Sequence, residues 1–88
     1  MQTYLVEHYQ PGLSAAGLQH AAALLRSSAA DLERGGSAVR YLRSTIVPGD
    51  EALLSVFEAD SESMVQEAYT RAGVPFERIS LALEEGDR

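Results

Sequence analysis

The chain has 88 residues and a formal net charge of −6. A chain of this length forms one small domain with little stability to spare, so we expect a single domain over residues 1–88. All seven basic residues are arginines, and they are scattered along the chain. Because nucleic-acid backbones and anionic membrane surfaces both require clustered positive charge, this composition argues against both partners.

Cysteine is absent, which excludes disulfides, thiolate catalysis and cysteine metal sites. No apolar run approaches the roughly 20 residues of a membrane span. The first residues lack the basic and long apolar regions of a secretion signal. We therefore expect a soluble cytoplasmic protein.

The first expected element is a strand over Thr3–Tyr9, which is rich in β-branched and aromatic residues. Alternation places Tyr4, Val6 and His8 on one face and the residues between them on the other. Both faces are largely apolar, which is typical of a central strand. Gln10, Pro11 and Gly12 end it.

A long helix is expected next, beginning after Ser14 as N-cap and ending near Arg34. Gly35 follows at the position where helices often end, and Arg34 complements the helix dipole. The apolar residues at helical spacing are Leu18, Ala21, Ala22, Leu25, Ala29 and Leu32.

The middle of the chain predicts a hairpin. Val39–Val47 and Ala52–Ala59 have strand composition, and a Pro-Gly-Asp-Glu turn separates them. A second helix is then capped by Asp60 or Ser61 and stops at Gly73.

The last strand is expected over Arg78–Glu84, where apolar and polar residues alternate, followed by a frayed tail over 85–88. The element order is βαββαβ, which right-handed crossovers convert into an α+β ferredoxin-like sandwich. This fold has a four-stranded antiparallel sheet with its first and third strands central, and both helices cover one face. The open face would expose Leu5 and Tyr9, so we expect a homodimer packed sheet to sheet as a dimeric α/β barrel.

Glu7 is the candidate acid or base, because an ionised carboxylate in a central strand needs a partner. It either pairs with an arginine on a neighbouring strand, such as Arg43, or faces a dimer cavity that raises its pKa towards that of a general base. His8 is a second catalytic candidate or a satisfied core histidine. His20 points away from the apolar stripe of its helix, as surface histidines do.

Tyr9, Tyr41, Arg43 and Phe57 are candidate ligand-binding residues, although aromatic residues on strands also serve as packing. Glu58 is expected near Glu7 on a neighbouring strand, which gives the candidate metal ligands Glu7, His8 and Glu58. Glu7 and His8 are adjacent in the strand and therefore face opposite sides of the sheet, which argues against both of them binding one metal ion.

Three segments of the chain are YLVEH, VRYLRSTIVPGDEALLSVFEA and VQEAYTRAGVPFERI. Together they resemble a family of small bacterial domains, first described as a domain of unknown function and often labelled nickel-binding. The resemblance covers nearly the whole chain and implies a ferredoxin-like fold, commonly dimeric, and nickel as a cofactor. Positions that match the family pattern are Val6, Glu7, Tyr41, Ser44 and Glu67. Arg43 and Ala68 stand where the pattern has histidine.

Three functions are therefore open. The first is a dimer that binds a small apolar molecule in a cavity on the open sheet face, including a cofactor-independent isomerase or cyclase. The second is a nickel or other divalent-metal binder, and the third is a non-catalytic interaction module.

Overall fold

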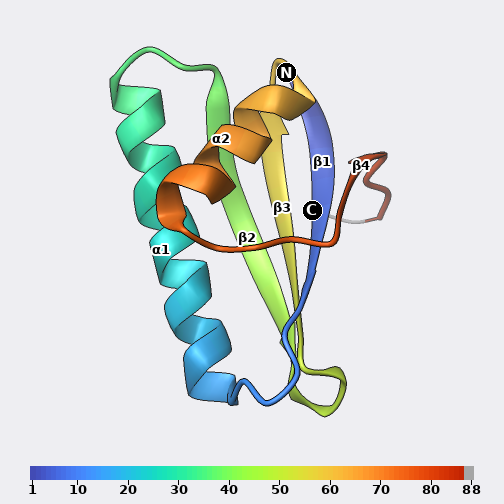
Figure 1. Ribbon diagram of the computed structural model, residues 1–88. Coiled ribbons are helices and arrows are strands. Elements are labelled where there is room, and N and C mark those ends of the chain that lie inside the picture. The colour runs from blue at the N-terminus through green and yellow to red at the C-terminus, as the bar shows by residue number, and fades with distance from the viewer. Residues whose placement is uncertain (87–88) are drawn as a thin grey trace.

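The computed structural model describes residues 1–86 and has the predicted element order (Figure 1). The strands lie in the order β2 (Val39–Val47), β3 (Ala52–Ala59), β1 (Gln2–Tyr9) and β4 (Arg78–Ala82), and each neighbouring pair is antiparallel. The ferredoxin-like α+β prediction with two central strands is thereby confirmed. The elements are β1 (Gln2–Tyr9), α1 (Ala15–Arg34), β2 (Val39–Val47), a 3-10 turn (Pro48–Asp50), β3 (Ala52–Ala59), α2 (Glu62–Ala72) and β4 (Arg78–Ala82).

Two predicted strand boundaries differ from the structure, because β1 begins at Gln2, one residue before the predicted Thr3, and β4 ends early. The strand β4 ends at Ala82, two residues early, because Ala82 already pairs with Thr3 and β1 begins at Gln2. Helix α1 ends at Arg34 as predicted, but the glycine with left-handed backbone is Gly36, with φ +99°, and not Gly35, which has φ −80°. Of the tail predicted to fray, residues 87–88 lie outside the described part of the chain.

The core lies between the sheet and the two helices, which cover the same face (Figure 1). Four aromatic rings run through it in sequence, with centroid separations of 5.5, 5.6 and 5.4 Å. They are Tyr41, Phe57, Tyr69 and Phe76. The helices are joined by the buried Ser28 hydroxyl, which donates to the Ala68 carbonyl at 2.7 Å.

A β-bulge in the edge strand β2 decides which side each candidate residue faces. The register shifts between Tyr41 and Arg43, so that Tyr41 pairs with Phe57 and Arg43 with Val56. Phe57 is buried on the helix side, whereas Val56 belongs to the open face. The extra residue is Leu42. No helix within residues 1–86 is long and apolar enough to cross a membrane.

Candidate functional site

Glu7 lies on the open sheet face and is already ion-paired. Arg78 approaches one carboxylate oxygen with its Nε at 2.7 Å and a terminal nitrogen at 2.6 Å, and the Tyr9 hydroxyl donates to the other at 3.0 Å. Arg78 first, and Tyr9 second, lower the pKa of Glu7 below its ordinary value. The partner is therefore Arg78 and not Arg43, because β4 lies beside β1 in the register Glu7–Arg78. This lowering is opposite to the raised pKa expected for a general base in a dimer cavity.

We expect the stabilising effect of Glu7 to depend on pH. A carboxyl whose pKa is lowered by folding contributes stability above its ordinary pKa of 4.5, and loses it as the pH falls through the lowered value. Glu7→Gln should therefore be less stable than the parent chain at neutral pH, and equally stable in acid. Urea unfolding of both chains at pH 7 and about pH 3 measures this, and an equal difference at both pH values would contradict the ionic role.

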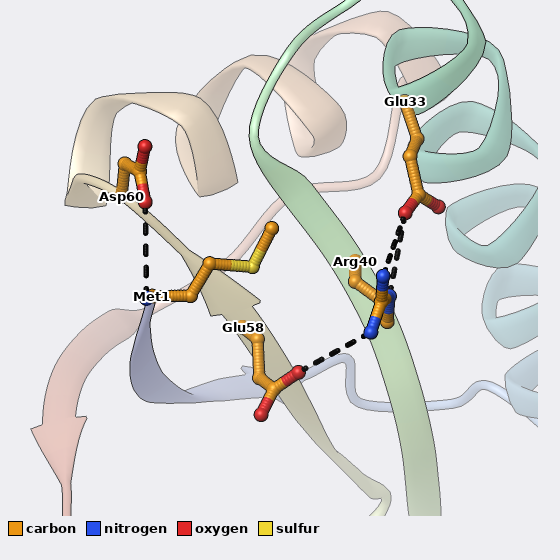
Figure 2. A network of polar contacts seen from close by, with 5 residues as sticks. All are labelled: Met1, Glu33, Arg40, Glu58 and Asp60. Carbon is orange, nitrogen blue, oxygen red and sulfur yellow. Dashed lines mark hydrogen bonds and ion pairs between the residues drawn. The ribbon is translucent and has the colours of Figure 1, made fainter.

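Glu58 is not near Glu7. Glu58 pairs with Thr3 and Glu7 pairs with Leu54, so about 13 Å of strand separates the two positions. Figure 2 shows Glu58 facing Arg40, which also contacts Glu33. The ion-pair distances are 3.9 Å from Arg40 to Glu58 and 3.3 Å from Arg40 to Glu33. The expectation of a Glu7–Glu58 pair is wrong because antiparallel register places the two acids at opposite ends of the open face.

His8 lies on the opposite face, toward the helices, and its side chain is only 1% exposed. Its Nε2 lies 3.0 Å from the side-chain oxygen of Gln10. An amide oxygen accepts only, so Nε2 is the donor in this contact. Nδ1 is buried and has no hydrogen-bond partner within residues 1–86. The histidine is therefore buried as expected, but only half satisfied.

The predicted metal ligands Glu7, His8 and Glu58 are thus not brought together. In the described part of the chain, no group of three or more His, Asp or Glu side chains is placed to hold a metal ion. The physical reason is the one anticipated for neighbouring strand residues, namely that Glu7 and His8 face opposite sides of the sheet.

His8 instead shares a pocket with the only other histidine, His20. The pocket has a volume of about 180 Å³ and lies between the end of β1, the first half of α1 and the segment 73–75. Gln10 also lines it, and its apolar walls are Leu13, Ala21, Leu24, Val74 and Pro75. His20 is exposed, as predicted, yet its neighbours in the pocket were missed. The alternation of the first strand indicated that His8 faces away from Glu7. The sequence does not predict which end of that strand α1 covers, so it did not indicate that His20 lies near His8.

The four predicted ligand-binding residues separate into three places. Tyr41 and Arg43 line a groove of about 520 Å³ with α1 residues. Tyr9 is 44% exposed on the open face, and Phe57 is fully buried in the core. Arg43 also borders a second hollow of about 530 Å³ with Glu58 and Glu84, and it is ion-paired to Glu84.

These features define a small ferredoxin-like domain with pockets of mixed polar and apolar lining on both sides of its sheet. The sequence model described as nickel responsive protein SCO4226-like matches residues 4–81, and the chain belongs to this family. The crystal structure of SCO4226 from Streptomyces coelicolor A3(2) has a TM-score of 0.71 and 17% sequence identity to this chain, covering 96% of it and 99% of the other. At that identity the likeness shows the fold. No curated protein matches the chain.

Proposed function

We propose that this chain is a divalent transition-metal-binding protein that holds nickel or a similar cation at the His8–His20 pocket. The observation that carries the proposal is the buried His8 imidazole with one nitrogen bonded to Gln10 and the other unpartnered within residues 1–86. Imidazoles that coordinate metals typically donate their second nitrogen to a carbonyl or carboxylate, which fixes the tautomer. The membership of a nickel-responsive family supports the same class of ligand.

The side chains that line the His8–His20 pocket offer the type of ligand atom that nickel prefers. Nickel and zinc favour imidazole nitrogen, whereas magnesium favours oxygen. His8 and His20 supply two imidazoles, and the Gln10 side chain lines the same pocket. Because His20 is exposed on a helix, its side chain can change rotamer toward the pocket. The described chain offers no third histidine or acid there, so water or another molecule completes the coordination.

Calorimetric titration of tag-free, chelator-stripped protein with Ni²⁺ tests this function. We expect one site per chain with a Kd of about 1 μM, or about −8 kcal/mol, and weaker binding of Zn²⁺. Mg²⁺ serves as the oxygen-preferring control and should give no heat. Absence of nickel binding would refute the proposal for this chain.

We also propose that a second copy of the chain covers the open sheet face. Its centre carries the half-buried aliphatic residues Leu5, Leu54 and Val56. Around them lie both signs of charge, in the pairs Glu7–Arg78 and Arg40–Glu58. A twofold interface brings the same patch against itself, so a surface with mixed charges is compatible with its own copy.

Leu54→Glu should convert this dimer to a monomer, because it buries a charge at the centre of the apolar patch. Sedimentation equilibrium measures the mass against the 9.5 kDa of one chain. Leu24→Glu makes the same change at an exposed position on α1, and it should leave the mass unchanged. A parent chain that sediments as a monomer would contradict the dimer without bearing on metal binding.

A further inference from the structure

We infer that the groove between α1 and β2 binds a small organic oxyanion, a carboxylate or phosphate ester with a short apolar body. The groove follows the edge strand β2 beside α1, away from the His8–His20 pocket, so it takes in Tyr41 from the helix side and Arg43 from the open face. Its volume of about 520 Å³ falls within the range of about 300–1,000 Å³ found for small-molecule sites. Gln19 and Arg26 reach it from the helix, and Tyr41, Arg43 and Ser44 from the strand.

The charge of the groove is opposite to that of the chain as a whole. The protein has a net charge of −6, yet two arginines and no acidic residue of the described chain line this groove. Arg26 forms no ion pair within residues 1–86, whereas Arg40 and Arg78 are paired with glutamates. A locally cationic groove on an acidic protein favours an anionic ligand.

Arg26 is also positioned for such a ligand. Its guanidinium carbon lies 5.5 Å from the centroid of the Tyr41 ring. Packing against the ring restrains the guanidinium, which reduces the entropy lost when it binds a carboxylate or phosphate through paired N–H groups. Arg43 is ion-paired to Glu84, but both side chains are at least half exposed, so a ligand displaces Glu84 at little cost.

A chain of hydroxyl groups adds a donor. The Tyr41 hydroxyl lies 2.6 Å from that of Ser44, which lies 2.8 Å from that of the buried Ser55. Three hydroxyls have three hydrogens, and the two bonds between them use two. When Ser55 donates to Ser44 and Ser44 to Tyr41, the Tyr41 hydroxyl is left to donate to an oxyanion.

The remaining lining accounts for the apolar part of the ligand. Ala22, Leu42 and Ile46 contribute aliphatic surface beside the polar groups. Leu42 is the extra residue of the β-bulge, and bulges often redirect side chains next to binding sites. An inorganic anion would leave this surface uncovered, so the groove suits a ligand with both parts.

The test is a ¹H–¹⁵N NMR titration of the chelator-stripped protein with hexanoate and with hexyl phosphate. We expect saturable shifts at Arg26 and at Tyr41–Ser44 for at least one of them, with a Kd of about 1 mM or tighter. The probe that binds more tightly assigns the oxyanion. Hexanol has the apolar body without the charge, and binding of hexanol as tight as that of both anions would overturn the proposal.

Arg26→Gln should weaken the better probe by at least about tenfold. Arg71→Gln is the matched control, because it removes the same charge from an exposed position on α2 outside the groove. Equal weakening by the two variants would show that only net charge matters, and would overturn the site. Since no metal is present in these titrations, the result is independent of the His8–His20 proposal.

Discussion

Replacing Phe57 with alanine is expected to remove most of the free energy of unfolding of this domain. Phe57 is fully buried, and its ring lies between Tyr41 at 5.5 Å and Tyr69 at 5.6 Å. Removing a buried phenylalanine side chain costs about 3–5 kcal/mol through lost transfer energy and the cavity left behind. Small domains have total stabilities near the lower end of about 5–15 kcal/mol, so this loss removes most of the margin.

Urea unfolding measures the effect, with Phe57→Leu and Tyr9→Ala as comparisons. Phe57→Leu keeps most of the buried volume and should cost much less. Tyr9→Ala removes an aromatic ring that is 44% exposed on the open face, and should change stability by about 1 kcal/mol or less. If Phe57→Ala remained as stable as Tyr9→Ala, Phe57 would not be a core residue and its role as a ligand-binding residue would be open again.

The contrast between these two aromatics shows how far sequence reasoning reaches. Alternation, turn residues and helix caps predicted β2 and β3 to the residue, because each of these signals acts within a few neighbouring positions. The end of β4 was predicted wrongly because it depends on where its neighbour β1 begins. The length of an edge strand therefore depends on the strand beside it, and the alternating pattern of the edge strand alone does not predict where it ends.

Predicting which candidate site residues lie together requires the register between neighbouring strands, and the sequence predicts that register only in part. An arginine partner was one of two alternatives for Glu7, and the choice of Arg78 follows from the pairing of these two positions in β1 and β4. Tyr41 and Arg43 were expected in one site on the open face. A single extra residue at Leu42 separates their pairing, so that Tyr41 faces the helices while Arg43 pairs with Val56. A bulge of this kind reverses the facing of every residue beyond it.

Replacing both histidines with glutamine is expected to abolish nickel binding. Each single substitution, His8→Gln or His20→Gln, should weaken the binding of Ni²⁺ by at least about 100-fold, or about 2.8 kcal/mol. His8 is buried and its replacement affects packing, so thermal unfolding must accompany the titration. His20 is exposed, and its variant should fold as the parent chain does. The His20 variant therefore separates a lost ligand from a lost fold.

The acids of the originally predicted set are the matched controls for this experiment. Glu7→Gln and Glu58→Gln remove carboxylates from the open face, where the structure pairs them with Arg78 and Arg40. Neither side chain lines the His8–His20 pocket, so both variants should bind nickel within about twofold of the parent chain. Loss of binding in these variants, with binding retained in His20→Gln, would place the metal on the open sheet face. Such a site would need a second copy of the chain, because β1 directs Glu7 and His8 to opposite sides of one sheet.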